Sequence, residues 1–440
     1  MKRYEKYKPT GIQWLPEIPE HWKIENFGKH FSFGKGLPIT KADLTKEGIA
    51  VISYGQVHSK LNLGVTLSDS LIRYVSNRWL DTNPQNLLRK CDFVFADTSE
   101  DIAGAGNCAF NDYSKPLFAG YHIVIARPTM VENSRYWAYL FQSNCWKSQV
   151  QSLVNGVKVY SINKSILKKT AILIPSIAEQ EKIVAYLDKR ISLIENCKCQ
   201  RERELQTLNE LKQAEIASVV TRGLNPDVPM VYMDTPLKTK HPSHWKRVRN
   251  MTFLIEQTEK VGKQADDYQL LSLTTNGIIV RDVESGKGKF PKDFESYKVV
   301  EPGELVFCLF DIDETPRTIG LSQNHGMITG AYDVFKVKED IVNPSFVYAF
   351  YLVIDNIKAL KPYYSGLRKV VKHNRFMQIG FALPPIEEQN AIVEYIESKT
   401  SKIDTMIEAL KAEIDRLTEY KQRLISDVVT GQIDVRSEEI

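Results

Sequence analysis

Ile177-Ala-Glu-Gln-Glu-Lys-Ile-Val-Ala-Tyr186 returns later in the chain as Ile386-Glu-Glu-Gln-Asn-Ala-Ile-Val-Glu-Tyr395. Subtracting 177 from 386 gives an offset of 209 residues, and the same offset relates Val219-Val220-Thr221 to Val428-Val429-Thr430 without a gap. An insertion in a helix would rotate every later side chain off its face, so this long gapless match predicts a continuous helix in each copy.

Apolar residues in both copies follow the three- and four-residue steps of a heptad helix. Such a seam needs a partner helix, and the other copy in the same chain is the nearest one. At roughly 40 residues, each helix would be about 60 Å long, which favours a rod over an ordinary core helix pair. The seam residues are Val184, Leu187, Ile191, Ile194, Leu205 and Leu208 in the first copy and Val393, Ile396, Ile403, Ile407, Leu410, Ile414, Leu417 and Leu424 in the second.

A domain precedes each long helix. The run Gly11 to Trp22 has its counterpart in Pro242-Ser-His244-Trp245, so the order is domain, helix, domain, helix. Alternating and buried patterns predict strands at about 50–54, 93–96 and 121–126 in the first domain and at about 269–273, 305–310 and 332–337 in the second. A helix follows the strands in each domain. The first is capped by Asn133 and covers 134–153, and the second is capped by Asn343 and runs from Pro344 to about residue 360. The middles of the two domains share no sequence. The fold class is therefore α+β, with two domains of strands and helices, each followed by a long helix.

Composition narrows the class of protein. The chain has 440 residues, of which 25% are charged and 43% hydrophobic, as in ordinary globular proteins. A formal net charge of +4 permits nucleic-acid binding without requiring it. No apolar run is long enough to span a membrane, no signal-peptide pattern is present, and the six cysteines form no CxxC pair. We expect a cytoplasmic protein with no membrane partner.

Motifs for catalysis are missing from the sequence. Gly286-Lys-Gly288-Lys289 lacks the spacing of a phosphate-binding loop, and Gly104-Ala-Gly106 is an isolated GxG in an expected loop. Neither a SAM-binding glycine turn with its active-site motif nor a clustered His/Cys spacing for a metal occurs. We expect neither catalytic residues nor a metal site in this chain.

Two basic stretches without any acid rise above this background. One runs from Asn133 to Ala178 and the other from Asn356 to Ile386, and each ends where a long helix begins. Carboxylates would be repelled by phosphates, so such stretches suit a DNA-facing surface, although a solvated basic face is the alternative. Their bases are Arg135, Lys147, Lys158, Lys164, Lys168, Lys169, Lys358, Lys361, Arg368, Lys369, Lys372 and Arg375.

These residues carry a family resemblance over nearly the whole chain. Two variable domains, each followed by a long helix that opens with a Pro-x-x-Glu-Gln-like motif, resemble the specificity subunit of a type I restriction–modification enzyme. The most specific pieces are Trp14-Leu-Pro-Glu-Ile-Pro-Glu-His-Trp22, Pro175-Ser-Ile-Ala-Glu-Gln180 and Pro384-Pro-Ile-Glu-Glu-Gln389. The first helix motif departs slightly, with Ser176 where the second has Pro385.

The resemblance implies two mixed α/β domains separated by two long antiparallel helices in a pseudo-twofold repeat, and with them a domain plan. Residues 1–175 would be the first target recognition domain, 176–222 the first long helix, 223–383 the second recognition domain, and 384–440 the second helix with the C-terminal tail. Each domain would read one half of a bipartite, asymmetric double-stranded DNA site. The helices would set the spacer between the half-sites, and four residues inserted near Ser218 would then change that spacer.

The resemblance also implies partners. The helices would bind two modification subunits, which resemble SAM-dependent adenine methyltransferases, and ATP-dependent restriction subunits would join as translocase and nuclease. SAM, ATP and Mg would all belong to these partners, so this chain would hold no cofactor and perform no catalysis.

Base reading needs polar side chains on exposed loops, and phosphate contacts need cations. Glu179, Gln180, Glu388 and Gln389 either orient the helix starts or contact the modification subunits, and the sequence does not separate these roles. The candidate DNA-binding residues are Tyr54, Gln56, His58, Lys158, Tyr160, Asn163, Lys164 and Lys168 in the first domain and Thr274, Thr275, Asn276, Arg368, Lys369, Lys372 and Arg375 in the second.

Two other classes of protein compete with this interpretation. A coiled-coil adaptor that joins proteins would bind no DNA and would have no reason for two acid-free stretches. A self-contained restriction or methylation enzyme would need the SAM and nuclease motifs that are missing.

Overall fold

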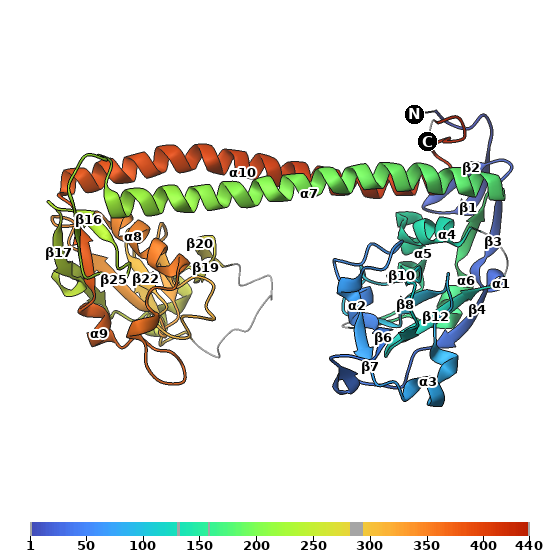
Figure 1. Ribbon diagram of the computed structural model, residues 1–440, viewed down its shortest axis with the longest axis horizontal. Coiled ribbons are helices and arrows are strands. Elements are labelled where there is room, and N and C mark those ends of the chain that lie inside the picture. The colour runs from blue at the N-terminus through green and yellow to red at the C-terminus, as the bar shows by residue number, and fades with distance from the viewer. Residues whose placement is uncertain (1, 130–132, 157–158, 282–293, 439–440) are drawn as a thin grey trace. The chain divides into compact units, whose positions relative to one another are not determined.

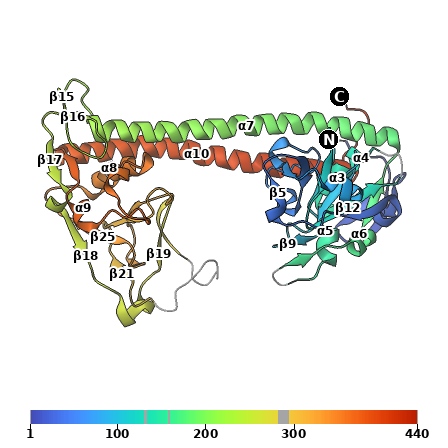
Figure 2. The same cartoon turned by 60° about the horizontal axis from the view of Figure 1, so that its bottom comes forward.

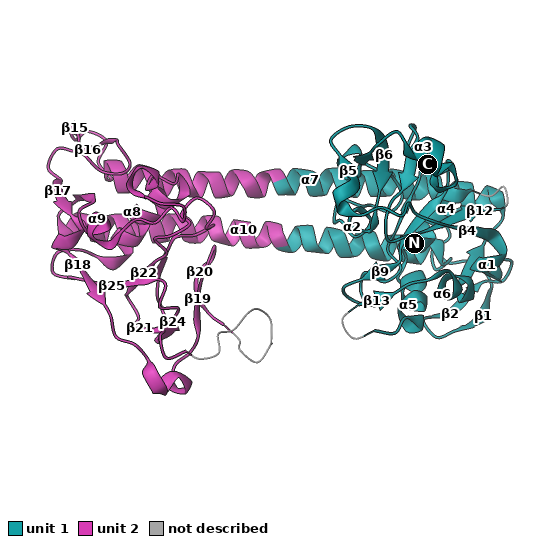
Figure 3. Cartoon of the chain, turned by 90° about the horizontal axis from the view of Figure 1, so that it is seen from below, with its two compact units in different colours: residues 1–202, 412–440 teal, residues 203–411 magenta. Residues whose placement is uncertain are grey.

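The structure, a computed structural model, describes residues 2–129, 133–156, 159–281 and 294–438. The chain forms two compact units, residues 1–202 with 412–440 (unit 1) and residues 203–411 (unit 2), coloured separately in Figure 3. The expected long helices are confirmed as α7 (Ile177–Arg222) and α10 (Ile386–Val429). Each unit contains part of both helices, so the unit borders fall inside the helices, whereas the domain plan from the sequence placed its limits at the helix ends. No helix among the described residues has the length and apolarity to cross a membrane.

Within each unit the two long helices run antiparallel. In unit 1, Lys421 Nζ donates to Glu195 at 2.6 Å and Arg201 Nε donates to Glu413 at 3.1 Å, so residue numbers rise on α7 as they fall on α10. In unit 2, Lys212 Nζ donates to Asp404 at 2.6 Å. The offset of 209 residues turns Glu195 into Asp404 and Lys212 into Lys421. One ion pair therefore occurs once in each unit, with the acid and the base exchanged between the helices. Such partly exposed pairs contribute little stability, but they mark the register.

Unit 1 is built on a four-stranded antiparallel sheet in the order β10-β8-β12-β4. Its core joins this sheet to α4 and α5 and to the long helices, and Figure 1 shows α4 and α5 between the sheet and α7. A second sheet, β11-β6-β7-β5, contains a parallel pair, β11 with β6. The strands are β4 (Phe31–Lys35), β5 (Leu44–Thr45), β6 (Ile49–Ile52), β7 (Arg73–Val75), β8 (Phe93–Ala96), β10 (Cys108–Phe110), β11 (Leu117–Ala119) and β12 (Ile123–Pro128).

Two-stranded ladders and short helices complete unit 1. They pair β1 (Tyr7–Ile12) with β2 (Leu15–Pro19), β3 (Lys23–Asn26) with β14 (Ala171–Ile174), and β9 (Thr98–Ser99) with β13 (Tyr160–Ser161). The helices are α1 (Phe27–His30), α2 (Tyr54–Val57), α3 (Trp79–Thr82), α4 (Ser134–Gln142), α5 (Asn144–Leu153) and α6 (Lys164–Lys169).

Unit 2 repeats the main sheet of unit 1 strand for strand. Its order, β23-β22-β25-β18, matches β10-β8-β12-β4, although the sequences of these middles do not align. Smaller ladders pair β15 (Met230–Tyr232) with β16 (Lys240–Pro242), β17 (Lys246–Arg249) with β26 (Gly380–Leu383), β19 (Leu271–Thr274) with β20 (Gly277–Val280), and β21 (Lys298–Val300) with β24 (Gly326–Ile328). The main strands are β18 (Leu254–Gln257), β22 (Leu305–Phe307), β23 (Ile319–Leu321) and β25 (Asp333–Val337), and the helices are α8 (Pro344–Asn356) and α9 (His373–Met377).

Several boundaries predicted from the sequence were wrong. The strand expected over 305–310 ends at Phe307, and the one expected over 121–126 runs from Ile123 to Pro128. The single helix expected over 134–153 is interrupted at Ser143, whose extended backbone and hydroxyl cap a new helix by accepting the Trp146 N–H at 3.2 Å. The strand expected over 50–54 ends at Ile52, because Ser53 caps α2. The helix expected to reach residue 360 ends at Asn356.

Candidate nucleic-acid interface

Tyr54 and His58 line a cavity of unit 1 of about 810 Å³. The Tyr54 ring lies 5.3 Å from that of His122, and His58 Nε2 lies 2.8 Å from the carbonyl oxygen of Thr98. The Gln56 side chain is not free to contact a base, because its Oε1 accepts the Ser53 N–H and closes the cap of α2. Two of the three candidates in this group therefore line one cavity, and Gln56 is not among its lining residues.

The loop after β8 brings the second group of candidates to the same face. β9 pairs with β13, so Tyr160 lies opposite Ser99 on the cavity rim. A neighbouring cavity of about 560 Å³ is lined by Asn163 and Lys164, and it shares His122 with the first. The fold thus joins stretches about one hundred residues apart into one polar surface. Lys158 lies outside the described residues.

Asn163, Lys164 and Lys168 belong to α6 and its cap. Asn163 Oδ1 accepts the N–H groups of Ser165 and Ile166, so its side chain is used as a helix cap. Lys164 and Lys168 are exposed, and Lys168 Nζ lies 5.6 Å from the centre of the Phe33 ring. Neither lysine forms an ion pair with another described residue, which leaves both ammonium groups available to a phosphate.

The second acid-free stretch meets acids in space. Arg368 and Lys369 lie in a turn closed by paired backbone hydrogen bonds between Ser365 and Val370. Lys369 Nζ lies 3.3 Å from Asp313 and makes an ion pair with Glu314, while Arg368 lies 3.4 Å from Asp311. The stretch of sequence around Arg368 and Lys369 contains no acid, but the folded protein places carboxylates beside both side chains. The loop after β22 supplies these carboxylates.

The remaining candidates of unit 2 lie in the β19–β20 hairpin and at α9. Thr275 and Asn276 form the two-residue turn between β19 and β20, and the Thr274 hydroxyl donates to Gly277 at 2.9 Å. Lys372 precedes α9, and Arg375 lies on it over the ring of Tyr363 at 5.7 Å. Their roles in DNA binding stay predictions.

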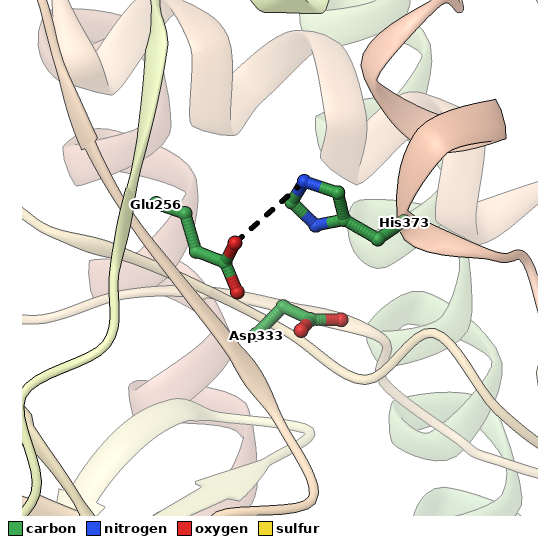
Figure 4. A group of neighbouring side chains, drawn as sticks. All are labelled: Glu256, Asp333 and His373. Atoms are coloured by element: carbon green, nitrogen blue, oxygen red, sulfur yellow. Dashed lines mark ion pairs between the residues drawn. The ribbon is translucent and has the colours of Figure 1, made fainter.

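One group of metal-ligand types occurs among the described residues, and the sequence did not suggest it. Figure 4 shows Glu256, Asp333 and His373 facing one another in unit 2, with their ligand atoms within 4.8 Å. Glu256 and His373 Nε2 lie 3.6 Å apart, and Lys298 Nζ lies 3.7 Å from Asp333. Burial raises the pKa of the Asp333 carboxyl, and the ammonium group of Lys298 already balances its charge. We therefore interpret the group as an ion-pair network.

Gln180 and Gln389 have the same buried role at the two helix starts. Gln180 Nε2 donates to the Pro175 carbonyl at 3.1 Å, and its Oε1 accepts the Asn133 N–H at 3.2 Å. Gln389 repeats this with Pro384 at 2.9 Å and Asn343 at 2.8 Å. Both side chains are fully buried. Their amides are used inside their own units, which favours the helix-orienting role over contact with another subunit.

Glu179 and Glu388 bind a matching histidine in each unit. Glu179 is buried and accepts from Tyr4 at 2.6 Å and pairs with His21 at 2.9 Å. Glu388 pairs with His244 at 2.7 Å. These contacts attach the segment around each buried tryptophan to the start of its long helix.

Sequence reasoning missed His122 and Asn107 in the unit 1 cavities, and it named Lys147 only as one base of the first acid-free stretch. His122, Asn107 and Lys147 line the larger cavity, and burial lowers the pKa of the Lys147 ammonium. The isolated Gly104-Ala-Gly106 was a visible signal, since it marks a turn. Its meaning depends on which loops meet, and a single sequence does not state that.

Comparisons with known proteins agree with this geometry. Residues 19–207 match the family model described as the type I restriction modification DNA specificity domain. The type I restriction enzyme StySPI specificity subunit of Salmonella potsdam is 22% identical over 370 residues, covering 80% of this chain and 78% of that protein. The MjaVIII specificity subunit of Methanocaldococcus jannaschii is 21% identical over 454 residues, covering 96% and 95%. A solved chain, described as the structural basis of complex assembly and conformational transition of the type I R-M system, has a TM-score of 0.64 at 13% identity, covering 94% of this chain and 99% of that one.

Proposed function

We propose, for a chain that belongs to the type I restriction–modification specificity subunits, that each unit reads one half of a two-part DNA site. The observation that carries this proposal is the repeat itself. Two units share one sheet order and one way of holding the long helices, yet they carry different loops and different polar surfaces. A scaffold that repeats while its exposed side chains differ suits two modules that read different base sequences.

The chemistry belongs to other subunits in this proposal. Two modification subunits methylate adenine with SAM, and restriction subunits use ATP and Mg for translocation and cleavage. This chain contributes the choice of sequence and the helices that set the spacer. A coiled-coil adaptor is the competing function, and the exposed, unpaired lysines of α6 argue against it.

The decisive experiment sequences the methylome of a host that expresses the chain with the modification subunit encoded beside it, compared with a host lacking the chain. We expect a new adenine-methylated motif with two specific halves around a non-specific spacer. If the modification subunit binds the chain but no chain-dependent methylation follows, the adaptor function replaces this one.

Removing charge from α6 should weaken DNA binding without changing the sequence that is read. We expect the complex of the Lys164→Ala/Lys168→Ala variant to lose about two units of the slope of log K against log salt, because each phosphate contact contributes about 0.9. Fluorescence anisotropy with a duplex of the methylated motif measures this slope from low to moderate salt.

The matched control for these lysines is Lys369→Ala, because Lys369 already pairs with carboxylates of its own unit. Its loss should change the slope by less than about half a unit. An unchanged slope in the α6 variant would contradict the phosphate role of Lys164 and Lys168, while methylation of the motif would still support the proposed function.

A further inference from the structure

Asp188 on α7 is bound by side chains of unit 1 itself. Arg135 Nε donates to both oxygens of its carboxylate at 3.0 Å, and the Tyr139 hydroxyl donates at 2.5 Å. Tyr139 is 1% exposed, and burial together with this hydrogen bond raises the pKa of its hydroxyl, so it remains a donor. An aromatic ring and a guanidinium from α4 therefore fill the surface of the long helix at this point.

The equivalent residues of unit 2 can be assigned from the shared contacts. Asn133 and Asn343 cap α4 and α8 and are held by Gln180 and Gln389 in the same way. Counting from these caps, Ser345 takes the place of Arg135 and Ala349 takes the place of Tyr139. On the long helices, the offset of 209 residues places Glu397 where unit 1 has Asp188. Unit 2 keeps the acid but lacks both large side chains that cover it.

A groove of about 300 Å³ lies in unit 2 where unit 1 is filled. Leu187 is fully buried in unit 1, whereas its counterpart Ile396 is partly exposed in the groove wall. Figure 2 shows α8 beside α7 and α10 at this place within unit 2. The groove is lined by Lys212, Ile216, Leu321, Ser345, Tyr348, Ala349, Leu352, Val393, Ile396, Glu397 and Thr400.

The loop that covers this place in unit 1 is also shorter in unit 2. Residues 58–72 lead from α2 to β7 and place Val65 and Thr66 against the Arg135 guanidinium, with both contacts at 3.4 Å. Between β19 and β20 of unit 2, Thr275 and Asn276 alone form the connection. Three independent differences, two small side chains and a short turn, leave the same groove open.

We propose that this groove holds an aromatic side chain, next to a basic residue, from a modification subunit, and that unit 2 is therefore the tighter of its two binding sites on the chain. The proposal rests on the function proposed above. The occupant is inferred from unit 1, where the chain fills the equivalent space with tyrosine and arginine. Glu397 forms no ion pair with any described residue, so it offers a basic group the partner that Asp188 already has.

The physical gain comes from two sources. An aromatic side chain buried among Ile216, Leu352 and Ile396 removes apolar surface from water on both partners. A guanidinium on Glu397 adds a charge-assisted hydrogen bond in a partly desolvated place. Unit 1 offers neither, since its own residues occupy both positions. The two units therefore present unequal surfaces to identical modification subunits.

The test fills the groove of unit 2 with the residues of unit 1. The modification subunit is titrated into the full-length chain in a calorimeter, and native mass spectrometry counts the bound copies. We expect two binding steps that differ at least tenfold in Kd for the wild type. In Ser345→Arg/Ala349→Tyr, the tighter step should weaken at least tenfold while the other step keeps its Kd.

Ser398→Arg on the exposed face of α10 is the matched control for added bulk and charge, and it should leave both steps unchanged. Glu397→Gln keeps the shape of the helix surface and should weaken only the tighter step, by several fold. Two equal steps in the wild type, or an unchanged tight step in the double variant, would overturn the proposal even if the methylated motif is found.

Two other occupants would also overturn it. If light scattering shows a dimer of the free wild-type chain that the double variant lacks, a second copy of the chain covers the groove. If deleting residues 282–293, which lie outside the described part of the chain, speeds hydrogen exchange of α8 in the free protein, the chain covers its own groove. Absence of both binding steps together with absence of methylation would instead reject the proposed function and this inference with it.

Discussion

Four helix-forming residues inserted after Glu202, together with four inserted after Lys411, will lengthen the spacer of the methylated motif by about one or two base pairs and leave both half-sites unchanged. Both positions lie at the border of the two units, between the ion pairs Glu195–Lys421 and Lys212–Asp404. Four residues add one turn, about 6 Å, to each helix, and a base pair rises about 3.4 Å. The flanking ion pairs, one in each unit, stay in register because both helices lengthen equally.

The control for this prediction inserts four residues in α7 alone. With one helix longer than the other, α7 and α10 cannot keep the register of both ion pairs, because the two registers differ by one turn. We therefore expect loss of methylation or of stability rather than a new spacer. Ser218, the position that the repeat alone suggested, is a poorer choice, since Val219 and Val220 directly after it are buried in the core of unit 2. Methylome sequencing measures the outcome, and changed half-sites with a constant spacer would reject the role of the helices in spacing.

The long helices could be predicted because their evidence is local and repeated. The heptad residues and the caps at Asn133 and Asn343 concern residues within a few turns of one another, and the gapless offset repeats the helix pattern. The structure confirms the caps and both helices. The helix break at Ser143 is local too, but a serine inside an apolar pattern is compatible with both a helix interior and a cap. The hydroxyl that accepts the Trp146 N–H decides between them.

The shared sheet order and the candidate surfaces could not be predicted in the same way. Many different apolar residues can fill the same buried position of a strand. The two domains therefore share the strand order, β10-β8-β12-β4 in one and β23-β22-β25-β18 in the other, without a sequence match in their middles. The charge around a side chain also depends on loops that are distant in the sequence. Lys369 was expected to face phosphate because its own stretch lacks acids, yet Asp313 and Glu314 from a loop fifty residues earlier lie against it.

Gln389→Ala will expose α8 to hydrogen exchange while it leaves α4 protected. The substitution removes the acceptor of the Asn343 N–H and the donor to two carbonyl groups, those of Pro384 and Ile341. Leaving buried polar groups without partners costs about 1–3 kcal/mol each, so we expect unit 2 to lose about 3–5 kcal/mol of stability. That loss corresponds to exchange of α8 at least about a hundredfold faster, read by mass spectrometry on peptides covering Pro344–Asn356.

Gln180→Ala should have the opposite effect on the two helices: hydrogen exchange becomes fast in α4 and stays slow in α8. The reason is that each glutamine holds its own unit by the same kind of hydrogen bonds. Gln389→Glu separates lost hydrogen bonds from lost volume. Its carboxylate would face two carbonyl oxygens, so its folded pKa would be raised above the unfolded value of about 4.3. Relative to the wild type at the same pH, that variant would then lose least stability below about pH 4, and the loss would grow as the pH rises through the folded pKa. Stability equal to that of the wild type at every pH would show that the space filled by the side chain, and not its hydrogen bonding, holds the start of α10.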